Sequence, residues 1–128
     1  PSVCPKLRII TRPTALGVTA NFDHTIAACT SSFIALCDQD DIWPPGRVER
    51  LLPIFDDPAV SLVHTDARLV DSSGSLTGTR LLQALELSSG ERVALASDAA
   101  YGVLLRRNVV TGATVVLRRS LAESASQF

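Results

Sequence analysis

Cys37-Asp38-Gln39-Asp40-Asp41-Ile42-Trp43 is the stretch that decides the fold, because it places three carboxylates directly after the apolar run Phe33–Leu36. An apolar run of this kind predicts a strand buried on both faces of a parallel sheet. In open α/β sheets, ligands bind at the carboxyl ends of such strands. Clustered carboxylates repel one another unless a cation joins them, and Mg²⁺ commonly combines one or two carboxylates with substrate phosphates. The pattern predicts a metal–phosphate site, with a solvated acidic turn that caps the next helix as the alternative.

Length and composition restrict the class of protein. The 128 residues fit one domain, and a hydrophobic content of 46% is ample for a core. The 12 basic and 13 acidic residues nearly cancel, which argues against a nucleic-acid partner. Cys4, Cys29 and Cys37 form no C-x-x-C pair, so we expect free thiols in a reducing compartment. No apolar run approaches the ~20 residues that cross a bilayer. We therefore expect a cytoplasmic protein, either free or attached peripherally to the inner face of the membrane.

Strand and helix patterns alternate on both sides of the acidic stretch. Short apolar or alternating runs predict strands at Leu7–Ile10, Phe33–Cys37, Val60–Val70 and Ala113–Leu117. Apolar residues at helical spacing predict helices at Asn21–Cys29 and Arg47–Phe55, with further helices over Leu81–Leu87 and from about Ser120. This alternation implies βαβ units and a mainly parallel sheet, with Phe33–Cys37 as its central strand.

Four segments resemble family-2 glycosyltransferases, particularly the rhamnosyltransferase-like branch, and they occur in the order found in that family. They are the acidic heptad, Leu16–Phe22, Leu62–Ala67 and Asn108–Thr114. The resemblance implies a three-layer α/β/α nucleotide-diphospho-sugar transferase domain of the GT-A type. The implied enzyme transfers a sugar, rhamnose being usual in the branch, from a nucleotide-diphosphate sugar to an acceptor hydroxyl with inversion. Its implied setting is bacterial polysaccharide or O-antigen synthesis, with a glycan or lipid-linked acceptor.

The resemblance also implies roles for individual residues. Asp38 and Asp40 correspond to the D-x-D motif, in which Asp40 is expected to ligate Mn²⁺ or Mg²⁺ and Asp38 to lie nearer the ribose or a metal-bound water. Asn21 and Gln39 are expected on the donor side of the site. The residues expected on the acceptor side are Trp43, Asp66, Thr111 and Gly112.

Several of these residues fit a structural role as well. Trp43 either stacks on a sugar or packs beneath the Pro44–Pro45 turn. Asp41 either contributes to the site or holds the loop and caps the following helix. Gly112 either allows close backbone approach to the sugar or forms a plain turn. His64, at the end of an expected strand, is expected to be structural.

Two motifs of the family do not occur between Pro1 and Phe128. One is an N-terminal acidic pair that holds the nucleoside base, and the other is a later acidic motif that supplies the catalytic base. The resemblance thus implies that residues 1–128 form a partial catalytic domain, with the base beyond Phe128. We expect little or no transfer by this piece alone, and self-association through an exposed sheet edge.

Two other functions compete with sugar transfer. The first is a non-catalytic nucleotide- or sugar-binding domain that retains the sheet and the acids. The second is a Mg²⁺-dependent phosphohydrolase, which is less well supported because no nucleophile stands in a known setting. Binding of nucleotide diphosphates with and without metal separates sugar transfer from the first alternative, and release of phosphate from simple esters would support the second.

Overall fold

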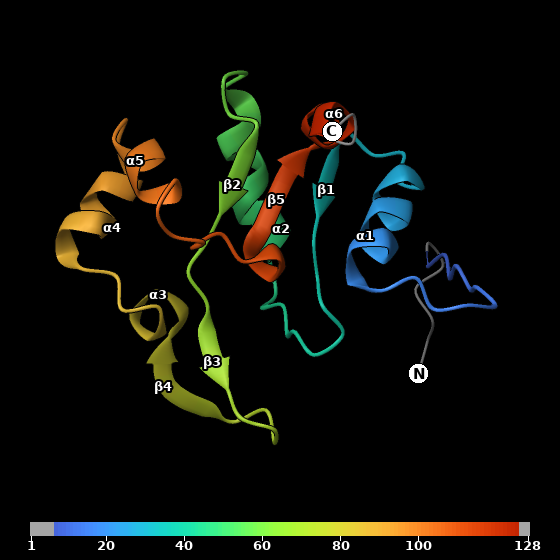
Figure 1. Ribbon diagram of the computed structural model, residues 1–128, viewed down its shortest axis with the longest axis horizontal. Helices are drawn as coiled ribbons and strands as arrows, with labels where there is room; N and C mark the ends of the chain where they lie inside the picture. The colour runs from blue at the N-terminus through green and yellow to red at the C-terminus, as the bar shows by residue number, and fades with distance from the viewer. Residues whose placement is uncertain (1–6, 126–128) are drawn as a thin grey trace. The chain divides into compact units, whose positions relative to one another are not determined.

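The computed structural model describes residues 7–125 (Figure 1). The chain divides into two compact units. The first unit joins the described residues up to Ile34 with those from Arg118 onward, and the second spans Ala35–Leu117. Cys4 lies outside the described residues. The chain contains both helices and short strands, which confirms the mixed α/β composition that was predicted, whereas the parallel sheet is not observed among the described residues.

In the first unit, helix α1 (Val18–Ala27) contacts helix α6 (Arg119–Ala125). Both helices were predicted, although α1 begins three residues earlier than expected. Its start follows Gly17, whose φ of 79° lies in the left-handed region that favours glycine. The predicted strand at Leu7–Ile10 is wrong, because these residues carry no strand assignment. A strand needs a partner for its backbone groups, and none of the described strands pairs with this segment.

A three-stranded sheet has the order β1-β5-β2, formed by β1 (Phe33–Ala35), β5 (Val115–Arg118) and β2 (Leu62–His64) (Figure 1). Strand β5 is antiparallel to β2, with His64 opposite Val115. Two backbone hydrogen bonds give the direction of β5 against β1. The Leu36 amide donates to the Val115 carbonyl at 3.2 Å, and the Arg119 amide donates to the Ser32 carbonyl at 2.9 Å. Residue numbers rise on one strand as they fall on the other, so this pair is antiparallel as well.

The predicted parallel sheet with Phe33–Cys37 at its centre is therefore wrong for these strands. The central strand is β5, in which Val115, Val116 and Leu117 are all buried. β1 lies at an edge of this sheet and ends at Ala35, two residues before Cys37. An apolar run reports burial on two faces but carries no information on strand direction, which is set by the partner that pairs with it.

Helix α2 (Arg47–Leu51) continues into the 3₁₀ helix η1 (Leu52–Asp56), which confirms the predicted helix. Its apolar face buries Leu51 and Phe55. Gly46 precedes it with a φ of 69°, and this left-handed turn follows Pro44–Pro45 and directs the chain into the helix.

The predicted strand Val60–Val70 is divided in two, because residues 65–67 leave the extended pairing. Its second part, β3 (Arg68–Val70), forms an antiparallel hairpin with β4 (Leu76–Arg80). The Asp71 carboxylate closes the turn by accepting hydrogen bonds from the amides of Ser73 and Ser75 and the Ser73 hydroxyl. These bonds, that of the Ser73 hydroxyl above all, hold the pKa of Asp71 below its ordinary value.

The rest of the second unit is made of short helices. They are α3 (Leu81–Ala84), α4 (Ser89–Leu95), α5 (Ala100–Leu104) and the 3₁₀ helix η2 (Gly112–Thr114). The helix predicted at Leu81–Leu87 corresponds to α3. Within residues 7–125, no helix combines the length and apolar character required to span a membrane.

Candidate functional site

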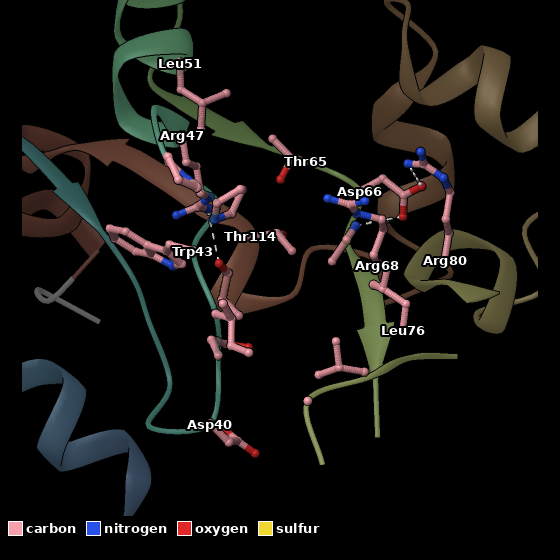
Figure 2. A pocket seen from close by; sticks show the side chains of 18 of the residues that line it. Asp40, Trp43, Arg47, Leu51, Thr65, Asp66, Arg68, Leu76, Arg80 and Thr114 are labelled. Atoms are coloured by element: carbon pink, nitrogen blue, oxygen red, sulfur yellow. Dashed lines mark hydrogen bonds and ion pairs between the residues drawn. The ribbon is translucent and has the colours of Figure 1, made fainter. Parts of the chain in front are cut away.

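A pocket of about 580 Å³ lies within the second unit, and three parts of the chain line it. The first part is the acidic loop, defined here as residues 38–45, together with α2. The second is the segment after β2 with the β3–β4 hairpin, and the third is Ala113 and Thr114 of η2 (Figure 2). A volume of this size is typical of small-molecule sites.

The acidic loop is closed by its own third carboxylate. Asp41 accepts a hydrogen bond from the Asp38 amide at 3.0 Å, and the Asp41 amide donates to the Asp38 carbonyl at 3.3 Å. Of the two roles considered for Asp41, this geometry supports the one that holds the loop. Asp41 nevertheless also lines the pocket.

Asp40 is the carboxylate that the loop leaves available. It is exposed and lines the pocket, and its side chain has no hydrogen-bond or ion-pair partner within residues 7–125. Figure 2 shows it pointing away from Trp43 and Arg47. Asp38 is half-buried and Gln39 is exposed, and neither belongs to the lining. The structure thus brings Asp40 to the pocket but not the other two predicted donor-side residues of the loop.

The oxygen atoms that line the pocket suit a hard cation for which the substrate supplies some of the ligands. Across residues 7–125, no three His, Cys, Asp or Glu side chains gather closely enough to hold a metal by themselves. Mg²⁺, however, usually takes one or two carboxylates and completes its shell with water and phosphate oxygens. The exposed Asp40 carboxylate, free of internal hydrogen bonds, fits that type of site, whereas an all-protein cage does not fit.

Trp43 and Arg47 form the most tightly constructed part of the pocket. The Arg47 guanidinium lies over the Trp43 ring, with its central carbon 4.6 Å from the ring centroid. Its Nη2 donates to the Ala113 carbonyl at 3.1 Å, which joins α2 to η2 (Figure 2). Trp43 keeps 36% of its surface exposed, whereas Arg47 keeps only 9%. The aromatic side chain that the sequence placed on the acceptor side is thus fixed against a buried cation.

Sequence reasoning did not identify Arg47 as a site residue and placed it only at the start of a predicted helix. The only available signal was its position four residues after Trp43, in the first turn that follows Pro44–Pro45. Burial of a charged side chain depends on the carbonyl and the ring that meet it, and these come from distant positions in the sequence.

Asp66 lies in the pocket lining with its carboxylate fully engaged. Its Oδ1 accepts hydrogen bonds from the amides of Ala67 at 2.9 Å and Leu82 at 3.0 Å. Its Oδ2 lies 3.4 Å from Nη1 of Arg80 (Figure 2). These contacts connect the start of α3 to the segment that separates β2 from β3, so Asp66 organises this wall of the pocket.

Thr111 and Gly112 stand just outside the lining, next to Ala113 and Thr114. The Thr111 carbonyl accepts from the Thr114 amide and the Thr114 hydroxyl, which forms the turn of η2. A Cβ added to Gly112 would meet its nearest neighbour, Leu36, at 3.9 Å, which is ordinary contact. The surrounding protein therefore does not require glycine at this position.

Asn21 lies in the first unit, where it lines a second pocket of about 310 Å³ together with Arg12 and His24. His64 stands in β2, and its Nδ1 is buried without a hydrogen-bond partner among the described residues. Cys37 begins the acidic heptad with an exposed free thiol. Partial burial and the Asp41 carboxylate raise the pKa of this thiol above its ordinary value.

Comparison with known proteins gives the class of this chain. Residues 3–119 match glycosyl transferase family 2, and the chain belongs to that family. Family membership suggests transfer of sugar from a nucleotide sugar to an acceptor, with a divalent metal as the common cofactor.

Among individual proteins, the chain is similar to the uncharacterized proteins Mb1547 of Mycobacterium bovis and Rv1520 of Mycobacterium tuberculosis. Each is 27% identical over 114 residues, which is 88% of this chain and 30% of the relative. The chain thus spans about 30% of the length of these relatives. No solved structure gives a significant match.

Proposed function

We propose that this chain is part of the catalytic domain of an inverting, metal-dependent hexosyltransferase of the rhamnosyltransferase-like branch, with a three-layer GT-A-type fold. The observation that carries the proposal is the free Asp40 carboxylate at the edge of a ligand-sized pocket, in a chain that belongs to glycosyl transferase family 2. The proposed donor is a nucleotide-diphosphate sugar. The proposed acceptor is a hydroxyl of a glycan or lipid-linked sugar in bacterial polysaccharide or O-antigen synthesis.

In this proposal, Asp40 would hold the divalent cation, with Asp38 close to the ribose or a metal-bound water. The cation supplies neutralisation of the charge that develops on the departing diphosphate. Asp41 contributes by fixing the loop, since its carboxylate binds the Asp38 amide and limits the conformations open to Asp40. A fixed loop lowers the entropy cost of bringing Asp40 to the ligand.

The acceptor side of the proposed site comprises Trp43, Asp66, Thr111 and Gly112. Trp43 offers a half-exposed ring face at the pocket and Asp66 holds the opposite wall, while Thr111 and Gly112 set the turn that presents Ala113. Asn21 and Gln39 remain proposed donor-side residues. Cys29 and Cys37 are free thiols, which supports a cytoplasmic setting for the reaction.

Calorimetry with nucleoside diphosphates, with and without Mn²⁺, tests the proposal. We expect binding that depends on metal and that weakens by at least about tenfold in Asp40→Asn, because even outer-shell partners of metals cost 10–100-fold when removed. Asp98→Asn is the matched control, since Asp98 is an exposed carboxylate of the same unit outside the pocket lining. Absence of nucleotide binding with metal present would instead favour the non-catalytic binding or structural domain, and equal losses in both variants would remove Asp40 from the site.

A further inference from the structure

Arg47 carries a hydrogen-bonding group that the fold itself does not use. The residue is 9% exposed, and its Nη1 is buried with no hydrogen-bond partner in the described part of the chain. A guanidinium has five N–H donors arranged in a planar fork, and a buried charged donor without a partner is costly. Nη2 already donates one hydrogen bond to the Ala113 carbonyl, and Nη1 is the nitrogen of this side chain that is buried without a partner among the described residues.

No carboxylate of the pocket lining neutralises the charge of the Arg47 guanidinium. Asp66 is paired with Arg80 and two amides, and Asp41 is bound to the amide of Asp38. Asp40, the remaining carboxylate of the lining, points away from Arg47 (Figure 2). None of the acidic residues that line the pocket therefore contacts the Arg47 guanidinium, although a carboxylate or phosphate is its best geometric partner.

A second arginine adds to this positive character. Arg68 is exposed in the same lining, and its side chain has neither a hydrogen bond nor an ion pair within residues 7–125. The segment that bears it follows Asp66, whose carboxylate is engaged elsewhere. An anion that enters the pocket would be attracted by Arg68 at the surface and held by the more rigid Arg47 inside.

We propose that Arg47 is an oxyanion-binding residue, whose Nη1 donates to a phosphate or carboxylate oxygen of the ligand in this pocket, independently of any metal. The site differs from the proposed cation site at Asp40, because its binding group belongs to α2 and is held by the Ala113 carbonyl and the Trp43 ring. It rests on the proposed function only for the source of the anion. That source is either the diphosphate of the donor or an acidic group on the acceptor.

An anion bound at Nη1 lies close to Trp43. The Arg47 guanidinium carbon is 4.6 Å from the centroid of the Trp43 ring, so a charge that binds the guanidinium alters the surroundings of the indole. Trp43 is also the only tryptophan of the chain. Binding of an anion at Arg47 must therefore change the tryptophan fluorescence, and every such change reports on this one side chain.

The experiment is a fluorescence titration of the 128-residue chain in EDTA at constant ionic strength. Inorganic pyrophosphate represents the donor diphosphate, and glucuronate represents an acidic sugar of the acceptor. We expect a saturable change in Trp43 emission with at least one of them. A response to pyrophosphate alone identifies the donor as the source, and a response to glucuronate identifies an acidic acceptor.

Two variants define the expected losses. Arg47→Gln should weaken the response by at least about tenfold, since it removes a charge-assisted hydrogen bond. Arg106→Gln, which removes the same charge outside the pocket lining, should leave it unchanged. If circular dichroism shows that Arg47→Gln does not fold, Arg47→Lys replaces it. That variant keeps the charge but lacks the planar fork, so affinity should again fall about tenfold.

Three results would overturn the inference. They are a flat titration with both anions, an undiminished response in the folded Arg47 variant, and a response that appears only with Mn²⁺. The last would leave the proposed metal-dependent function standing without this site. Conversely, an Arg47-dependent response in EDTA, combined with no effect of metal on nucleotide binding, would keep this site and remove the proposed function.

Discussion

Asp66→Ala is the substitution that best separates the structural role of a pocket residue from a role in binding the acceptor. The sequence placed Asp66 on the acceptor side, whereas its carboxylate accepts from the amides of Ala67 and Leu82 and pairs with Arg80. Alanine removes all three contacts at once. It leaves the Leu82 amide, at the start of α3, without its partner.

The magnitude follows from the burial of each contact. The part-buried bond from the Leu82 amide to a charged acceptor is worth about 1.5–3 kcal/mol. The pair with Arg80, whose side chain is 61% exposed, adds about 0–1 kcal/mol, and the bond from the adjacent Ala67 amide is local and small. We expect Asp66→Ala to lower the free energy of unfolding by about 2–4 kcal/mol, a large share of the roughly 5–15 kcal/mol of a typical domain.

Asp66→Asn is the matched variant, because an amide oxygen can still accept from the Leu82 amide. It loses only the charge, so we expect a cost of about 1 kcal/mol. Urea denaturation followed by circular dichroism measures both variants, with nucleotide affinity measured on the folded proteins. The reasoning is refuted if Asp66→Ala unfolds at the wild-type urea concentration, and a selective loss of acceptor binding would then support the role predicted from the sequence.

Three further predictions concern the acidic loop and helix α4. Asp41→Asn keeps an oxygen for the Asp38 amide, so calorimetry should show a smaller loss of metal-dependent nucleotide affinity than for Asp40→Asn; an equal or larger loss would reverse the two roles. Because partial burial and Asp41 raise the pKa of the Cys37 thiol, this cysteine should be alkylated slowly at neutral pH, and Asp41→Asn should accelerate it in peptide mass spectrometry; an unchanged rate contradicts the electrostatic cause. Ser88→Ala removes the capping box of α4 and should cost about 1 kcal/mol in thermal unfolding at neutral pH. The Ser88 amide and hydroxyl both donate to the Glu91 carboxylate and lower its pKa, and alanine removes only the hydroxyl. The hydroxyl's share of the cost is therefore present above the ordinary pKa of 4.5 and is lost as the pH falls through the lowered pKa, whereas the bond from the Glu91 amide to the Ser88 hydroxyl does not titrate. A cost of Ser88→Ala that does not decrease in acid would argue against the hydroxyl's share.

Local structure was predictable wherever one periodic pattern was enough to define it. The helical spacing of Val48, Leu51 and Phe55 gave α2 and η1, and the apolar run Ala113–Leu117 gave β5. In each case the side chains that set the pattern are also those that the fold buries, or their immediate neighbours. Prediction succeeded here because burial and periodicity describe the same face of an element.

Pairing was not predictable in this way. The run at Phe33–Cys37 was read correctly as extended, but its direction relative to β5 depends on a segment about eighty residues later in the chain. Val60–Val70 looked continuous because its alternation is regular, yet Asp66 interrupts it by binding the Leu82 amide. Both errors come from hydrogen bonds between distant residues, which periodicity cannot report.

The site shows the same division between local and distant information. The cluster of acids was predictable from the sequence because three carboxylates in four residues can be recognised without tertiary context, and Asp40 does reach the pocket. The role of Arg47 was not predictable, since its burial depends on the Ala113 carbonyl sixty-six residues away. The carboxylate of the pocket could thus be predicted from a sequence motif, whereas the guanidinium could be identified only from the tertiary structure.

This combination restricts the ligand more than either group alone. A free carboxylate selects for a cation, whereas a buried guanidinium selects for an oxyanion, and Asp40 and Arg47 line one pocket without contacting each other (Figure 2). A neutral sugar could accept a hydrogen bond from the Arg47 Nη1 through a hydroxyl, but it would bring no charge to either group, and hydrogen bonds between charged partners are the stronger ones. A diphosphate that carries a divalent cation satisfies both, and so does a pair of ligands in which the acidic group belongs to the acceptor. The unpaired charges of this pocket therefore favour a ligand that brings charge of both signs. The diphosphate of a nucleotide sugar together with a divalent cation would be such a ligand.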